Sequence, residues 1–408
     1  MLAVCLSQLT FGQKIAELQM SFDKNTIDVP VRVNLDEITH LPAAEIVLVE
    51  VKGNERIAVP YQIENKGERM MYWLIQPEVN SPNKRTYELI KGDKKDKQVP
   101  LSVSKDNGAL IISAKDRKLL QYNYKTHYPP VGVDMAFKRS GFIHPLWTPN
   151  GQTLTRVDAP DHYHHYGLWN PWTRVLFEGD TIDFWNLKDR KGTVRFSDFA
   201  SINAGAVYGD YQTLHKHIAF TKQGEKDVIN ELQTVRIYQM DDSQDYYLAD
   251  ITIQLSCASD SPVILQDYRY GGLGWRATEK WDKNNSETLT SEGKARVDAD
   301  GSTARWVIVQ GSLDEDYGGA VMMSYPTNYN HPEPLRIWPE NSNGRGDVFA
   351  NFSPTKGKDW VLTPGNNYIL KYRLVVFNGK FSKEKAEEAW GNFANPPKVS
   401  IKLSSENN

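Results

Sequence analysis

The sequence predicts an all-β protein, a large antiparallel β-sandwich with one short C-terminal helix. Hydrophobic and polar residues alternate over short segments from one end of the chain to the other, which is typical of strands that pack on one face only. Signals for helices are few. The clearest alternating segments are 29–35, 57–63, 251–255 and 370–376.

The first two of these segments carry local signals of their own. Segment 29–35 contains Pro30, which has no backbone N–H and therefore favours an edge strand. Segment 57–63 follows Gly53 and Asn54, a pair typical of a tight hairpin turn. We therefore expect a half-buried strand at each place.

One helix is expected near the C-terminus. Ser382 is a good N-cap residue and precedes 383–390, a run rich in Lys, Glu and Ala. No repeat of 20 to 50 residues is visible, which argues against a propeller or a solenoid. A sandwich closed by a single helix is the fold that remains.

The domain organisation is predicted from composition and from two prolines. Pro129 and Pro130 cannot continue a central strand, so we place a boundary before them. An N-terminal β-sandwich region then covers 20–128, and the main β-sandwich, with the candidate site, covers 129–395. Residues 396–408 form a tail.

Residues 1–19 resemble a secretory signal, because an apolar run is followed by a possible cleavage site near Gly12. We therefore expect a periplasmic or secreted protein. Elsewhere no apolar stretch approaches the roughly 20 residues that span a bilayer. No membrane span is expected.

The composition excludes one class of partner and favours another. Lys plus Arg (48) nearly balance Asp plus Glu (51), so no basic field exists to attract nucleic acid. Two cysteines cannot form a disulfide framework. With 11 Trp and 20 Tyr, the chain has aromatic side chains to spare for stacking on sugar rings, which favours carbohydrate as the partner.

Histidine is unevenly distributed: five of the nine lie within 127–165, and three of those stand in 161–169 (Asp-His-Tyr-His-His-Tyr-Gly-Leu-Trp). If this segment is extended, His162 and His164 point to one face. Two imidazoles at this spacing can bind a divalent metal with a third ligand from elsewhere. The candidates for that ligand are His144, Asp158 and Glu340.

The same region also suits proton transfer. Abstraction of a proton next to a sugar carboxylate needs a base, an acid for the leaving oxygen and a cation that stabilises the developing charge. Each side chain alone could equally be a hydrogen-bonded structural residue. The candidate catalytic residues of the required types are His144, Arg156, His162, Tyr163, His164 and Arg269.

Two further segments suit ligand binding. Segment 267–276 places charged and aromatic residues around three glycines, which permit close approach of a ligand to the backbone. Segment 325–332 is a polar and aromatic loop. A glycine-rich turn and the cover of a sheet edge are the structural alternatives. With the tryptophans beside the histidines, the candidate substrate-binding residues are Trp169, Trp172, Trp275, Arg276, Asn328 and His331.

Four segments resemble, in the same order along the chain, a bacterial family of unknown function usually labelled methane oxygenase PmoA-like. The resemblance extends over roughly 144–377. The histidine-rich segment is the most specific part, and Tyr163 and Tyr166 depart from the family's pattern there. The segments are 161–169, 183–185, 271–276, and 326–328 with 331–332.

The resemblance implies a soluble protein found among sugar-degradation functions, and it carries over most directly to His162, His164 and His165. The label does not imply methane oxidation here, because a membrane methane monooxygenase subunit needs several spanning helices. The galactose-mutarotase-like kind of large β-sandwich is the fold that we expect.

The sequence therefore favours a carbohydrate-active enzyme that acts on a glycan or glycoside by lyase or hydrolase chemistry. Hydrolysis commonly uses two carboxylates facing a cleft, and no such pair can be assigned, which favours the lyase slightly. The alternative is a non-catalytic sugar-binding module. The cofactor is unknown, and a metal-dependent enzyme with a divalent metal is a third hypothesis.

Overall fold

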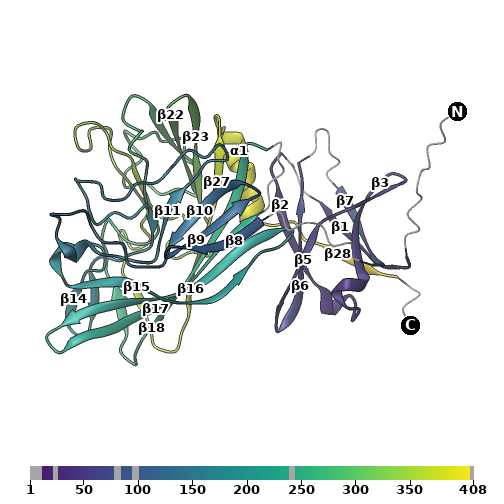
Figure 1. Ribbon diagram of the computed structural model, residues 1–408, viewed down its shortest axis with the longest axis horizontal. Coiled ribbons are helices and arrows are strands. Elements are labelled where there is room, and N and C mark those ends of the chain that lie inside the picture. Colours follow the sequence, from purple (N-terminus) through teal and green to yellow (C-terminus); the bar gives the residue numbers. More distant parts are fainter. Residues whose placement is uncertain (1–11, 22–25, 78–83, 94–100, 239–243, 405–408) are drawn as a thin grey trace. The chain divides into compact units, whose positions relative to one another are not determined.

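The computed structural model describes residues 12–21, 26–77, 84–93, 101–238 and 244–404. This part of the chain consists mainly of antiparallel strands, with a single α-helix near the C-terminus (Figure 1). The predicted fold class is confirmed. The chain forms two compact units, unit 1 (Met1–Val99 with Asn395–Asn408) and unit 2 (Pro100–Ala394).

Unit 1 contains a five-stranded sheet of order β28-β1-β7-β3-β4 and a three-stranded sheet of order β2-β6-β5. Alternating residues of both sheets share one core around Trp73. The elements are β1 (Lys14–Ser21), β2 (Val29–Asn34), η1 (Leu35–Glu37), η2 (Ala43–Glu45), β3 (Ile46–Lys52), β4 (Glu55–Ala58), β5 (Tyr61–Lys66), β6 (Glu68–Ile75), β7 (Lys84–Lys91) and β28 (Ser400–Leu403).

The two strand predictions in unit 1 have different outcomes. Segment 29–35 forms β2, an edge strand as Pro30 indicated. Segment 57–63 is not one strand, because β4 ends at Ala58 and β5, which begins at Tyr61, belongs to the other sheet. Pro60 lies between them and cannot donate a ladder hydrogen bond.

Unit 2 contains two eight-stranded sheets and one of four strands. The first large sheet has the order β24-β25-β20-β12-β11-β10-β9-β8. Its strands are β8 (Leu101–Asp106), β9 (Ala109–Ala114), β10 (Arg117–Asn123), β11 (Phe142–Leu146), β12 (Leu168–Trp169), β20 (Gly274–Arg276), β24 (Leu335–Ile337) and β25 (Phe349–Phe352), and the 3-10 turn η3 (Met135–Phe137) lies between β10 and β11.

The second large sheet has the order β15-β16-β17-β18-β27-β23-β22-β21. One continuous core draws on both large sheets, which makes unit 2 a sandwich. The strands are β15 (Gly192–Asn203), β16 (Tyr208–Thr221), β17 (Gly224–Tyr238), β18 (Tyr246–Cys257), β21 (Ser286–Thr290), β22 (Trp306–Leu313), β23 (Asp316–Ser324) and β27 (Tyr368–Asn378).

The smaller sheet and the helix complete unit 2. The four-stranded sheet has the order β14-β13-β19-β26. Helix α1 lies beside β22, β23 and β27 (yellow in Figure 1). The elements are β13 (Val175–Phe177), β14 (Asp180–Ile182), η4 (Leu187–Asp189), β19 (Val263–Leu265), β26 (Trp360–Leu362) and α1 (Lys383–Ala394).

Two strand predictions and the helix prediction in unit 2 are confirmed. Segments 251–255 and 370–376 lie in β18 and β27, which pair side by side in the second large sheet. The C-terminal helix begins where expected, and the hydroxyl of Ser382 accepts a hydrogen bond from the Lys385 N–H (3.2 Å). Local alternation and a local N-cap were sufficient for these elements.

The division between the units follows Val99, whereas the sequence placed a boundary at residue 128. Strands β8 to β10 join the first large sheet of unit 2. The domain boundaries 20–128, 129–395 and 396–408 stay a prediction.

The predicted leader covers residues 1–19, of which 1–11 lie outside the described residues, so it also stays a prediction. Residues 14–19 belong to β1, which pairs with β7 and β28. Within the described residues, no helix has the length and apolar character that crossing a membrane requires.

Candidate functional site

The histidine-rich segment lies in the connection between β11 and β12 of unit 2 and folds as turns. The N–H of His162 donates to the carbonyl of Ala159 (2.9 Å), and the N–H of His165 donates to the carbonyl of His162 (3.0 Å). The prediction of an extended segment with period two is therefore wrong. We call residues 161–166 the histidine turn.

Gly167 fixes the end of the histidine turn. Its φ of 58° is in the left-handed region, which glycine adopts without strain. Its N–H donates to the carbonyl of Arg156 (2.9 Å). A Cβ atom here would lie 2.3 Å from the carbonyl oxygen of Ile143 on β11, so this close approach requires glycine.

The turn brings three imidazoles together. One ligand atom from each of His162, His164 and His165 lies within 4.8 Å of the others. His162 and His164 are half-buried, and His165 is only 1% exposed. The third imidazole therefore comes from the turn itself, and not from the three residues that the sequence offered as a third ligand.

Aromatic rings surround these imidazoles. His165 packs against Phe349 (ring centroids 5.0 Å apart) and Trp169 (5.1 Å), and His162 packs against Trp338 (4.7 Å). Burial lowers the pKa of His164 to about 3 and that of His165 well below its ordinary value. Both imidazoles are therefore neutral at physiological pH.

A carboxylate orients His162, one of the two half-buried imidazoles. Nδ1 of His162 lies 2.7 Å from Oδ2 of Asp161, and that carboxylate also binds Arg276 (2.8 Å) and accepts from Asn343 (2.7 Å). Burial raises the pKa of Asp161, but His162 and Arg276 outweigh it and hold the pKa below its usual range. Asp161 is therefore ionised.

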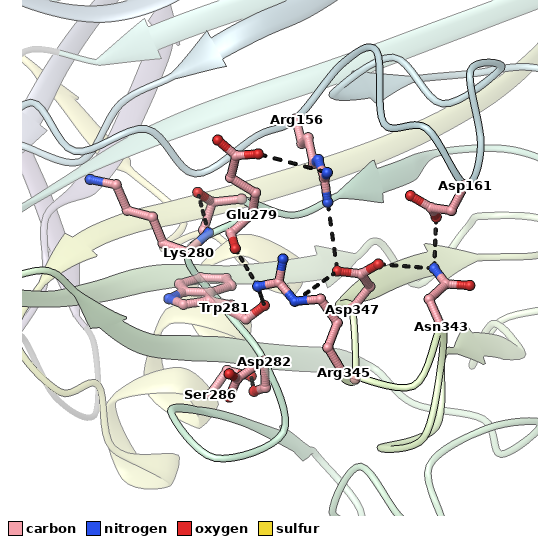
Figure 2. A network of polar contacts seen from close by, with 12 residues as sticks. Arg156, Asp161, Glu279, Lys280, Trp281, Asp282, Ser286, Asn343, Arg345 and Asp347 are labelled. Atoms are coloured by element: carbon pink, nitrogen blue, oxygen red, sulfur yellow. Dashed lines mark hydrogen bonds and ion pairs between the residues drawn. The ribbon is translucent and has the colours of Figure 1, made fainter.

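Arg276 lies at the centre of the charged network behind the turn. Its side chain is buried, its guanidinium lies 4.6 Å from the ring centre of Trp338, and one Nη binds both Asp161 and Asp347. Asp347 also faces Arg156 and Arg345, each at 3.6 Å. Figure 2 shows Asp347 between these two arginines, with Asn343 linking it to Asp161.

Two candidate residues lie outside the contacts of the turn. His144 has Nδ1 2.9 Å from the Thr155 hydroxyl, and burial, with His127 nearby, lowers its pKa to about 4. His127 in turn binds Asp158 (2.9 Å). Arg269 is exposed, with its guanidinium 5.5 Å from the ring centre of Tyr270. The candidate catalytic residues that meet are thus those of the turn, with Arg156 behind them.

Asn328 and His331 belong to another polar group. Nδ2 of Asn328 donates to buried Glu333 (2.7 Å), and Nδ1 of His331 lies 3.2 Å from the hydroxyl of Ser324, which also donates to Glu333 (2.6 Å). Burial raises the pKa of Glu333 to about 7. These contacts join Asn328 and His331 to Glu333 and not to the histidine turn.

The expectation of exposed tryptophans beside the histidines is wrong. Trp169, Trp172 and Trp275 are at most 1% exposed and pack inside unit 2. Trp185 is also buried. Abundant tryptophan signalled core packing in this region, because a large ring removes much apolar surface from water when it is enclosed. None of these rings offers a face to solvent.

An open cleft of about 580 Å³ lies near the turn. Phe137, whose neighbours line the cleft, packs against His164 (6.4 Å between ring centroids) and Tyr163 (5.7 Å). The cleft is lined by Thr126, Tyr128, Met135, Ala136, Lys138, Arg139, Ser140, Leu187, Arg190, Thr193, Arg195, Phe220 and Glu225.

The lining of the cleft carries positive charge. Four of its side chains are cationic and one, Glu225, is acidic; Glu225 binds Arg195 (2.6 Å). Arg139 is 2% exposed, and burial lowers its pKa to about 10, so it remains charged. Its Nη1 donates to a backbone carbonyl, and its Nε has no hydrogen-bond partner among the described residues.

A second group of histidines, which was not predicted from the sequence, lies inside unit 2. His215 and His217 on β16 bind the two oxygens of Glu231 on β17, at 2.9 and 2.8 Å. The hydroxyl of Tyr122 lies 2.5 Å from Nε2 of His215, and Asn170 donates to Glu231 (3.1 Å). All five side chains are buried. The His-x-His spacing within an alternating run was the signal that could have found this His–Glu–His cluster.

The chain belongs to a family of unknown function, DUF6807, which matches residues 109–391. No PmoA-like family is found, so the resemblance proposed from the sequence is wrong. The segments that suggested it all lie within the matched residues. No curated protein matches the chain.

Two solved structures from Enterococcus faecalis are similar over most of the chain. One is an alpha-mannosidase (TM-score 0.42) and the other a protein in glycosyl hydrolase family 38 (TM-score 0.41), each 10% identical over 95% of this chain. This chain spans 46% and 47% of their lengths.

Proposed function

We propose that the protein is a secreted or periplasmic carbohydrate-active enzyme, a lyase that acts on an acidic glycan at the histidine turn. One observation carries the proposal: Tyr163 and His164 pack against Phe137, whose chain neighbours Ala136 and Lys138 line a cleft with cationic side chains. Such a cleft suits the carboxylates of an acidic sugar chain.

The residues of the turn match the needs of a β-elimination. The reaction removes a proton from the carbon next to a sugar carboxylate, breaks the bond to the leaving oxygen and returns a proton to that oxygen. His162 and Tyr163 are both partly exposed and lie side by side in the turn, so they are the groups that can exchange protons with a substrate. Lys138 is exposed in the lining of the cleft and forms no ion pair among the described residues, so it can hold a carboxylate of the substrate.

The carboxylates of the region favour a lyase over a hydrolase. Glycoside hydrolysis commonly uses two carboxyl groups that face each other across the substrate. The described lining of the cleft has one, Glu225, which is paired with Arg195. Asp161 and Asp347 are both bound to Arg276. A free facing pair is therefore absent from these residues.

A non-catalytic sugar-binding module is the second candidate. The cleft has aromatic side chains on its surface, Tyr128 (57% exposed) and Phe220 (38% exposed), which can stack on sugar rings without any chemistry. This candidate predicts binding that does not depend on the histidine turn.

Turnover of acidic glycans separates the two candidates. The protein is incubated with pectate, alginate and glycosaminoglycans, and with neutral glycans for comparison, while ultraviolet absorbance detects the unsaturated product. We expect turnover of an acidic glycan that Tyr163→Phe abolishes with binding retained, and that Tyr325→Phe, far from the turn, leaves unchanged.

A pair of lysine variants tests whether positive charge in the cleft contributes to binding of an acidic glycan. Lys138→Ala should weaken binding of the acidic glycan, whereas Lys118→Ala, an exposed lysine on β10, should not. Binding without turnover would support the sugar-binding module. Neither binding nor turnover across both classes of glycan would overturn the proposal.

A further inference from the structure

We propose that His162, His164 and His165 form a binding site for one divalent transition-metal ion of the zinc class. Neutral imidazoles are the commonest protein ligands of such ions, and three histidines with an open fourth position are typical of catalytic zinc. The three ligand atoms already lie within 4.8 Å of one another, before any ion draws them in.

The distances require only a small adjustment. With metal–nitrogen bonds of about 2.0 Å, tetrahedral ligand atoms lie about 3.3 Å apart. His165 is fixed among aromatic rings. Asp161 orients His162, whereas His164 is half-buried and makes no side-chain hydrogen bond among the described residues. Two oriented ligands and one adjustable ligand can therefore close around an ion.

His165 gives an independent indication of a missing partner. It is 1% exposed, and its Nδ1 makes no hydrogen bond within the described part of the chain. A buried polar nitrogen normally has a partner. Tilted aromatic rings enclose the imidazole but cannot satisfy its nitrogens, so a ligand at the turn is the partner that the surroundings lack.

Asp161 prepares His162 as a ligand. Because Nδ1 of His162 bonds to the carboxylate of Asp161, its Nε2 is left for the metal. A carboxylate behind a coordinating histidine fixes the ring and raises its basicity. Arg276 and Asn343 hold Asp161 in turn, so this outer layer is already assembled.

The neighbouring charges do not exclude a cation. Arg276 is close to the turn, but its charge is matched by Asp161 and Asp347. The wider network balances as well, because three arginines face three carboxylates. These are Arg156, Arg276 and Arg345 with Asp161, Glu279 and Asp347.

The ion would have a role that rests on the proposed function. A β-elimination needs a cation where negative charge develops. Arg269 is exposed at Tyr270, and Arg156 is engaged by Asp347 and Glu279. A metal in the turn fills this role, and Tyr163 then remains as the proton-transfer group.

Metal binding is tested without reference to activity. The full chain is stripped with a chelator and titrated with Zn²⁺, Co²⁺ and Mn²⁺ in a calorimeter, and bound metal is counted by elemental analysis after gel filtration. We expect one ion per chain in the parent and in His40→Ala, an exposed histidine of unit 1. His162→Ala and His164→Ala should bind none.

Two further measurements test the proposed coordination. They use a variant of Asp161, the residue behind the ligand His162, and the absorption spectrum of bound cobalt. Asp161→Asn should lower the affinity about 10- to 100-fold with one ion still bound at saturation. Bound Co²⁺ should show the visible absorption of a four-coordinate site. Circular dichroism confirms that each variant is folded.

The possible outcomes separate this inference from the proposed function. If the parent binds no ion, or the histidine variants bind as much as the parent, the metal site is overturned even where glycan is turned over. If one ion binds at the turn but no glycan is turned over, the metal site stands and the lyase is overturned.

Discussion

Unit 2 contains two groups of histidines with carboxylates. They differ in how many of their polar atoms have a hydrogen-bond or ion-pair partner. In the His–Glu–His cluster both oxygens of Glu231 bind an imidazole, and every side chain is buried. In the histidine turn one imidazole of three has a carboxylate partner, and two of the rings are half-buried.

This difference separates a structural group from a functional candidate. A buried carboxylate is stable only if it is paired, and the two imidazoles hold the pKa of Glu231 below its usual value despite the desolvation that raises it. Little capacity remains there for a ligand. In the histidine turn, Nδ1 of His165 has no hydrogen-bond partner within the described part of the chain, so it can still bind a ligand.

The largest effect is expected from Glu231→Ala. Removing one partner from a buried ionic group leaves the others uncompensated, which costs about 3–5 kcal/mol. Urea denaturation followed by fluorescence measures this loss in the free energy of unfolding. Glu225→Ala, an exposed carboxylate on the neighbouring cleft, is the control and should change stability little. Equal losses in the two variants would contradict the structural role of the cluster.

Glu333 extends the comparison to a buried carboxylate without an imidazole. Its neighbours Ser324, Asn328 and Tyr372 are neutral, and burial raises its pKa from 4.5 to about 7. Since the folded state binds the proton more tightly than the unfolded state, stability falls as the pH rises from 4.5 to about 7.

Glu333→Gln should therefore flatten the pH dependence of stability. Between about pH 5 and about pH 8 we expect the parent to lose on the order of 2 kcal/mol more than this variant. Unfolding free energies at the two pH values measure the difference. Glu340→Gln, an exposed carboxylate, should behave as the parent. The same slope in parent and Glu333→Gln would show that Glu333 does not titrate in this range.

A smaller effect is expected from Tyr122→Phe. The change removes the hydroxyl 2.5 Å from Nε2 of His215 and leaves a buried nitrogen without a partner. The expected loss is about 1–2 kcal/mol. Tyr124→Phe serves as the matched control, because Tyr124 packs against Phe196 and Phe199 and its hydroxyl has no hydrogen bond among the described residues. A loss no larger than in the control would argue against a tightly matched cluster.

The sequence predicted three of the four alternating segments and the closing helix correctly, because alternation and an N-cap act within a few residues. The sequence-based prediction was wrong where contacts between residues far apart in the sequence determine the local conformation. The histidine turn bends because Gly167 packs against the backbone of β11, and Asp161 is held by Arg276, 115 positions away. His-x-His alternation was expected at His162 and is found instead on β16 at His215.

The burial of the tryptophans and the position of the third imidazole, that of His165, were not predicted, for related reasons. The number of aromatic residues does not show which of them are buried in the fold. Trp169 and Trp172 were therefore expected to be available at the surface for sugar binding. An extended backbone would point His165 away from His162 and His164, so the sequence did not group the three imidazoles. The histidine-rich segment was nevertheless located correctly as the place where titratable groups converge.

The smallest effect on stability is expected from His162→Ala in the metal-free protein, and His217→Ala sharpens the comparison. The side chain of His162 is 31% exposed, and Asp161 keeps Arg276 and Asn343 as partners when the imidazole is removed. We expect a loss below about 1 kcal/mol, since a partly exposed side chain contributes little packing. His217 is fully buried against Glu231, so the same substitution there should cost several times more. Chemical denaturation of both variants after removal of metal measures the ratio. If His162→Ala is as destabilising as His217→Ala, the histidine turn is a structural element, and its imidazoles are no longer the candidate site.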